Sequence, residues 1–176
     1  MKKKSFRVAF CGLITALTLV LMLMTTLIPV GTYALPCIAG ILLTAVVIEF
    51  GWKWAVAAYA AVSILSLFLA GDKEAVAYFI AFFGFYPIAK SGIERIKSVA
   101  LQYVIKYALF TICVIAAFLV TTLVLMIPTE EFKLFGIYVP WVFLIIGEIM
   151  FFFYDKCVTI LITRYIISVR SKLFHF

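Results

Sequence analysis

The residues of this chain that could do chemistry are ionisable side chains inside long apolar runs. Glu148 is the deepest acid, about 12 residues into the last run, which is roughly 18 Å along a helix and near mid-span. An ionisable group at that depth in a bilayer costs about 2.5–3.5 kcal/mol on insertion scales, so it is a functional hypothesis by default. Three roles are open for Glu148: a hydrogen-bonded structural carboxyl, a ligand contact at the floor of a pocket, or a proton-carrying group.

Four further charges share a second depth, closer to one end of the apolar runs. They are of both signs, and they lie on three separate runs: Glu49, Lys106, Asp155 and Lys156. Opposite charges at one depth predict ion pairs between helices, because an isolated charge there would be costly. We expect Lys106 to pair with Glu49 or with Asp155, in a structural role.

No catalytic or metal-binding motif is found along the chain. There is no GxxxxGK[ST], HExxH or GxSxG sequence, and the single histidine, His175, is next to the last residue. Glu148 and Asp155 share a helix face but lie about 10 Å apart along the axis, too far to share a proton. We therefore expect no catalysis, no metal and no cofactor.

These side chains must be positioned by membrane helices. The chain has 176 residues of which 67% are hydrophobic, too many for a soluble globule to keep its surface polar. A span needs about 20 apolar residues, and the runs lack the alternation of a transmembrane barrel. The sequence predicts an all-α membrane protein, a compact bundle in a single domain (1–176), with about six spans: 7–29, 33–50, 53–70, 74–90, 101–127 and 136–168.

The basic residues predict the orientation, since Lys and Arg are retained on the cytoplasmic side. Alternate gaps between the runs are basic, whereas the others hold only Lys73 and Lys133, each beside acids. We expect a multi-pass protein of the plasma membrane with both termini in the cytoplasm. The net charge of +7 then reflects loops that face anionic lipid rather than nucleic acid. The basic side holds Lys2, Lys3, Lys4, Arg7, Lys53, Lys90, Arg95, Lys97, Arg170 and Lys172.

The outward loops are either a lid over a pocket or plain connectors. Prolines bracket the first loop, and an acidic-basic turn at 69–74 forms the second. Aromatic residues gather at the same level, as an interfacial belt or as the rim of a ligand site: Tyr33, Tyr78, Tyr138 and Trp141. Tyr78, Phe82 and Phe85 recur at helical spacing, so we expect one shared face that either stacks a planar ligand or packs against neighbouring helices.

Small residues mark one face of the first helix. Ala9, Gly12 and Ala16 lie three and four residues apart, a spacing that lets two membrane helices approach closely. This face either packs inside the bundle or docks on another membrane subunit, and the sequence leaves both open.

Three segments and the topology carry a resemblance to a known family. A basic N-terminus leads into the small-residue helix (Lys2 to Ala16), Pro36 to Leu43 forms an apolar, glycine-containing stretch, and Asp155-Lys156 precedes an apolar run to Ile167. In these features, and in size and helix number over the whole chain, the protein resembles the substrate-binding (S) subunit of an energy-coupling factor (ECF) transporter, a type of ATP-binding cassette importer.

The resemblance implies a subunit that captures a vitamin or similar small molecule at the outer face. It would then associate with a membrane coupling subunit and two ATP-binding cassette subunits, with no catalysis in this chain. The docking face would include Ala9, Gly12 and Ala16. The ligand site would be formed by Tyr33, Lys73, Tyr78, Phe82, Tyr138, Trp141 and Glu148.

Two other functions stay open. One is a non-catalytic scaffold or assembly subunit of a bacterial membrane complex, and the other is a small proton-coupled carrier that uses Glu148. A binding subunit needs an outer pocket with a few convergent polar groups, whereas a scaffold should be filled solid. The aromatic outer rim with few charges favours a planar, weakly charged ligand.

Overall fold

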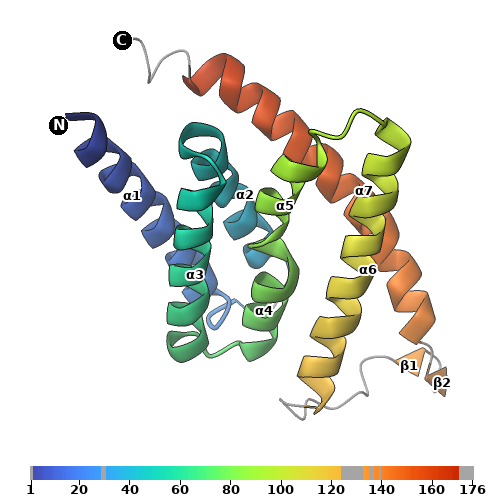
Figure 1. Ribbon diagram of the computed structural model, residues 1–176. Coiled ribbons are helices and arrows are strands. Elements are labelled where there is room, and N and C mark those ends of the chain that lie inside the picture. Colours follow the sequence, from blue (N-terminus) through green and yellow to red (C-terminus); the bar gives the residue numbers. More distant parts are fainter. Residues whose placement is uncertain (1, 29–30, 124–132, 135–136, 139, 171–176) are drawn as a thin grey trace. The chain divides into compact units, whose positions relative to one another are not determined.

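The computed structural model is helical almost throughout the residues that it describes, which are 2–28, 31–123, 133–134, 137–138 and 140–170 (Figure 1). The chain divides into two units, Met1–Ile127 and Pro128–Phe176. That both belong to the single domain expected from the sequence stays a prediction. Residues 29–30 of the first outward loop and the segment 124–132 lie outside the described residues.

The first unit holds all but one of the long helices. Its elements are α1 (Lys2–Met24), α2 (Ala34–Phe50), α3 (Trp52–Leu69), α4 (Lys73–Tyr78), a π-helical segment (Phe79–Phe83), α5 (Tyr86–Ile93) and α6 (Val99–Leu123). In the second unit, strand β1 (Lys133–Leu134) pairs antiparallel with β2 (Ile137–Tyr138), and α7 (Pro140–Arg164) is followed by a π-helical segment, Tyr165–Arg170.

Six helices stand where six spans were predicted, counting Lys73–Ile93 as one helix. Four of the described helices are long and apolar enough to cross a membrane: Lys4–Met24, Trp52–Leu69, Lys73–Ile93 and Val99–Val120. α2 is apolar but has only 17 residues, and α7 carries four charged side chains, from Glu148 to Arg164. The prediction of a helical membrane protein is confirmed at this level.

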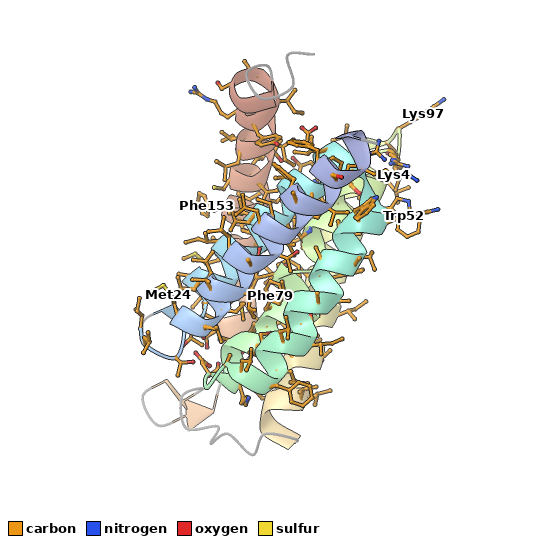
Figure 2. The ribbon with its side chains drawn as sticks, turned by 90° about the vertical axis from the view of Figure 1, so that its left-hand side faces the viewer. Lys4, Met24, Trp52, Phe79, Lys97 and Phe153 are labelled. Atoms are coloured by element: carbon orange, nitrogen blue, oxygen red, sulfur yellow. The ribbon has the colours of Figure 1, made fainter. Side chains whose placement is uncertain are left out.

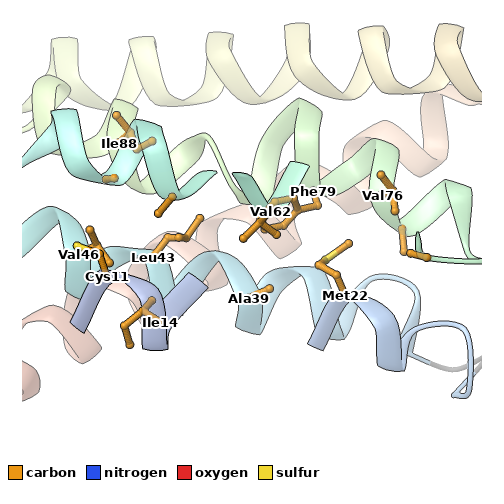
Figure 3. Close-up of a cluster of buried hydrophobic side chains, with 14 residues drawn as sticks. Cys11, Ile14, Met22, Ala39, Leu43, Val46, Val62, Val76, Phe79 and Ile88 are labelled. Atoms are coloured by element: carbon orange, nitrogen blue, oxygen red, sulfur yellow. The ribbon is translucent and has the colours of Figure 1, made fainter. Parts of the chain in front are cut away.

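The core of the first unit lies where α1, α2 and α3 pack against one another, with α2 also contacting α5 and the π-helical segment. Small side chains allow this close approach, because Ala39 on α2 and Ala55 and Ala58 on α3 are almost completely buried. Larger apolar groups such as Leu43 and Phe79 fill the space around them (Figure 3). α6 packs against α4, the π-helical segment and α5.

A single residue reverses the chain between α2 and α3. Gly51 has φ 83° and ψ 175°, a conformation that is essentially restricted to glycine. Its amide donates to the carbonyl of Val47 (3.0 Å), and its carbonyl accepts from the amide of Ala55 (3.3 Å). Both helix ends are therefore closed by the same residue, which places Trp52 directly after the turn.

The helices of the first unit run alternately up and down, so their connections collect at two ends (Figure 1). One end holds the N-terminus, the Gly51 turn and the α5–α6 connection, and Figure 2 shows Lys4, Trp52 and Lys97 together there. The other end holds the α1–α2 connection and residues 70–72. We call these the basic end and the acidic end of the unit, because Asp72 and Glu74 lie at the second.

Candidate functional site

Two connections distant in sequence are joined by hydrogen bonds at the acidic end. The amide of Gly71 donates to Oγ1 of Thr26 (2.9 Å), and the hydroxyl of Thr32 donates to Oδ2 of Asp72 (2.9 Å). Asp72 also caps α4 by accepting from the amide of Ala75 (2.9 Å). The approach is so close that a Cβ at Gly71 would stand 2.6 Å from the Thr26 methyl.

Tyr33 links these connections to the start of α4. Its hydroxyl donates to Oε1 of Glu74 (2.8 Å), and its ring lies 5.2 Å from the ring of Tyr78, centroid to centroid. Burial and the hydrogen bond to the Glu74 carboxylate both raise the pKa of Tyr33, so the phenol stays neutral and donates. The side chain of Tyr33 is nevertheless 50% exposed. The structure thus brings together two of the predicted site residues, Tyr33 and Tyr78, with Glu74, one of the outer acids beside Lys73.

Lys73 lies in the same turn but is directed to the end of α3. Its ammonium donates to the carbonyl oxygens of Leu67 (2.7 Å) and Ala70 (2.8 Å). A cation at a helix C-terminus satisfies carbonyls that have no partner within the helix and offsets the helix dipole. This gives Lys73 a structural role, whereas its predicted contact with a ligand stays a prediction.

The prediction that Tyr78, Phe82 and Phe85 share one helix face is wrong. The π-helical segment has more residues per turn than an α-helix, and the amide of Gly84 donates to the carbonyl of Phe79, five residues earlier (2.8 Å). As a result Phe82 is buried and Phe85 is exposed. Phe82 lies against the rings of Tyr86 and Phe110, each 5.0 Å away. This is the packing alternative drawn from the sequence, and a ligand contact of Phe82 stays a prediction.

The remaining predicted site residues belong to the second unit. Tyr138 lies in β2 and Trp141 is the second residue of α7, but their side chains fall outside the described part of the chain. Pro140 begins α7, as expected for a proline at the start of a helix. Glu148 lies on α7 and is partly buried. That these three residues join Tyr33 and Tyr78 stays a prediction.

A second polar cluster lies at the basic end, and it joins Lys106, which was predicted inside a span, to Lys90 and Glu94. The ammonium groups of Lys90 and Lys106 lie 2.8 Å and 2.9 Å from the same oxygen, Oε1 of Glu94. Both lysines are almost completely buried, with 1% and 4% of their surface exposed. Lys90 is therefore not a loop residue, because α5 continues to Ile93. The predicted pairing of Lys106 with Glu49 or Asp155 stays a prediction beside this new partner.

Each lysine of this cluster lies beside an aromatic ring. Lys90 lies 5.9 Å from the ring centroid of Tyr86, and Lys106 lies 5.9 Å from that of Tyr103. Burial raises the pKa of the Glu94 carboxyl, but the hydrogen bonds from Lys90 and Lys106 outweigh it and the pKa is lowered. The Glu94 carboxyl is thus ionised at neutral pH. The sequence contains a signal for one contact of this cluster, because Lys90 and Glu94 lie four residues apart, which is one turn of a helix.

The small-residue face of α1 points away from the packed helices. Ala9, Gly12 and Ala16 are all exposed, and a Cβ at Gly12 would have nothing within 4 Å. The buried residues of α1, among them Cys11, Ile14 and Thr18, lie on its other side. Within the first unit this face packs against no other helix, and both alternatives, packing inside the bundle and docking on another membrane subunit, stay predictions.

Within the described ranges, no group of three His, Cys, Asp or Glu side chains is placed to hold a metal ion. Comparison with models of known protein families finds no match, and comparisons with curated proteins and with solved structures find none either.

Proposed function

We propose that this chain is the substrate-binding subunit of an ECF-type importer in the plasma membrane. It captures a vitamin or similar small molecule at the acidic end and passes it to a membrane coupling subunit and ATP-binding cassette subunits. No reaction is catalysed by the chain itself. Glu148, Tyr138 and Trp141, in the second unit, are kept as predicted ligand contacts.

The observation that carries this proposal is the hydrogen-bonded junction at the acidic end. A simple helix-to-helix connector needs no contacts with a second connector, yet Thr26, Thr32 and Tyr33 all bond to residues 71–74. The junction holds a half-exposed aromatic ring beside a carboxylate on an otherwise apolar helical unit. Convergent polar groups of this kind fix the orientation of a small ligand.

The charges support an orientation with the acidic end outside. Lys4, Arg7, Lys53, Arg95 and Lys97 are exposed at the basic end, and cytoplasmic loops are enriched in such residues. The N-terminus belongs to this end and is therefore assigned to the cytoplasm. A cytoplasmic C-terminus is proposed from the basic residues Arg170 and Lys172 of the sequence. A ligand bound near Tyr33 would then be captured from outside the cell.

The exposed face of α1 supports a partner in the membrane. Small residues on a lipid-facing surface allow a second helix to approach closely, and Ala9, Gly12 and Ala16 have that character. In the proposed importer this partner is the coupling subunit. The same face also favours the alternative function, a scaffold subunit that binds membrane partners and no ligand.

Native mass spectrometry of the full chain, purified in detergent from cells grown in rich medium, tests the proposal. A co-purified small molecule of defined mass would support a binding subunit. A ligand-free chain associated with other membrane proteins, none of them an ATP-binding cassette or coupling subunit, would reject the importer and favour the scaffold.

A further inference from the structure

The side chains at the acidic end also indicate which charge a ligand bound there should have. We propose that the cluster formed by Tyr33, Glu74 and Tyr78 binds a small organic cation, either a protonated amine or a quaternary ammonium group. This inference rests on the proposed function and narrows its substrate class. It departs from the weakly charged ligand that the sequence favours.

The cluster combines the two kinds of group that recognise an organic cation. Glu74 supplies a carboxylate, and Tyr33 and Tyr78 supply aromatic faces 5.2 Å apart and inclined at 58°. Glu74 and Tyr78 are four residues apart, so they lie on the same side of the helix, facing Tyr33 from the other connection. A cation gains from a carboxylate by Coulomb attraction and from a ring face by the cation–π interaction.

The charged side chains next to this cluster in the described part of the chain make contacts of their own. The only basic side chain in the turn, Lys73, donates to the carbonyl oxygens of Leu67 and Ala70 and so offsets the dipole of α3. Asp72 uses one oxygen to cap α4 and the other to accept from Thr32. An anionic ligand would approach two carboxylates here, whereas a cationic ligand is attracted by both.

The cluster is accessible and pre-formed. Half of the Tyr33 side chain is exposed, and its hydroxyl is held by Glu74, which fixes the ring orientation before any ligand arrives. Pre-organisation of this kind lowers the entropy lost on binding.

Three aromatic probes of similar size and different charge test the inference on the full chain in detergent. Calorimetry with benzyltrimethylammonium, benzyl alcohol and benzoate should show the tightest binding for the ammonium, by about tenfold over the neutral alcohol, and none for benzoate. Equal binding of the ammonium and the alcohol, or tighter binding of benzoate, would overturn it. This comparison uses the wild-type chain alone, so it does not depend on the folding of a variant.

Two variants then locate the binding. Glu74→Gln should weaken ammonium binding by about tenfold, whereas Glu49→Gln, which removes the same charge at the basic end, should leave it unchanged. Equal loss in both would place the cation elsewhere. If native mass spectrometry finds an anionic co-purified molecule, the cation inference fails while the binding subunit stands. If no small molecule co-purifies and no probe binds, both proposals fail.

Discussion

The ammonium of Lys106 lies 2.9 Å from Oε1 of Glu94, although 12 residues separate them. This contact spans the connection between α5 and α6 and closes the two helices against each other. The same connection is fixed by the amide side chain of Gln102, which donates to the carbonyl of Ile96 (2.7 Å). The basic end of the first unit is therefore a rigid corner whose central group is one carboxylate.

Replacing Glu94 by Gln should destabilise this corner strongly. The two buried ammonium groups would lose the carboxylate that they share, and breaking a buried ion pair costs up to 3–5 kcal/mol. Because 37% of the Glu94 side chain is exposed, solvent recovers part of this, and we expect a loss of about 1–3 kcal/mol. Thermal unfolding in detergent measures the change.

Arg95→Gln is the matched control for that experiment. Arg95 is the next residue and is exposed, and its substitution also removes one charge. The melting temperature of this variant should therefore stay close to that of the wild type. If both variants melted at the same temperature, the Lys90–Glu94–Lys106 cluster would contribute nothing to stability.

The same carboxyl should make stability depend on pH. Hydrogen bonds from Lys90 and Lys106 outweigh burial and lower the pKa of Glu94 below its usual 4.5. The folded state therefore binds the proton more weakly than the unfolded chain, and the stabilising contribution is complete above pH 4.5. It is lost as the pH falls through the lower folded-state pKa. Melting curves of wild type and Glu94→Gln should differ at neutral pH and converge in acid; a constant difference would contradict this assignment.

Gly51→Ala should destabilise the turn between α2 and α3. At φ 83° and ψ 175° a Cβ is strained whatever the surrounding space, and holding such a residue costs about 1–3 kcal/mol. Gly92→Ala is the control, because it lies within α5, and nothing stands within 4 Å of the added carbon. Alanine there should be neutral or slightly stabilising. Equal melting temperatures for the two variants would show that the turn tolerates a side chain.

The long helices could be predicted from the sequence because each is an apolar run of span length. The runs 33–50 and 53–70 became Ala34–Phe50 and Trp52–Leu69, within a residue or so at each end. The first helix begins at Lys2 and not at residue 7, where its apolar run begins, because the basic residues before that run contain no helix breaker. Run length decides these elements, so distant contacts are not needed to find them.

The π-helical segment Phe79–Phe83 could not be predicted in this way. It depends on tertiary contacts: the hydroxyl of Tyr59 on α3 donates to the carbonyl of Ile80 (2.7 Å), and Gly84 lies where a Cβ would be 2.7 Å from the Tyr59 ring. A π-helical turn that shifts the helix by one residue has no signal in the amino-acid composition of the segment. The pairing of Tyr33 with Glu74 depends likewise on two connections 41 residues apart.

Gly12→Leu should separate partner binding from folding. Position 12 has open space, so leucine adds no clash within the first unit and the melting temperature should stay near that of wild type. On the proposed docking face, however, the larger side chain would keep a second helix from approaching Ala9 and Ala16 closely. We expect partner co-purification and transport to be lost while the small molecule still co-purifies. Leu13→Ala, a change at the adjacent exposed position, is the control and should retain the partner. Retention of the partner by Gly12→Leu would move the docking surface away from α1.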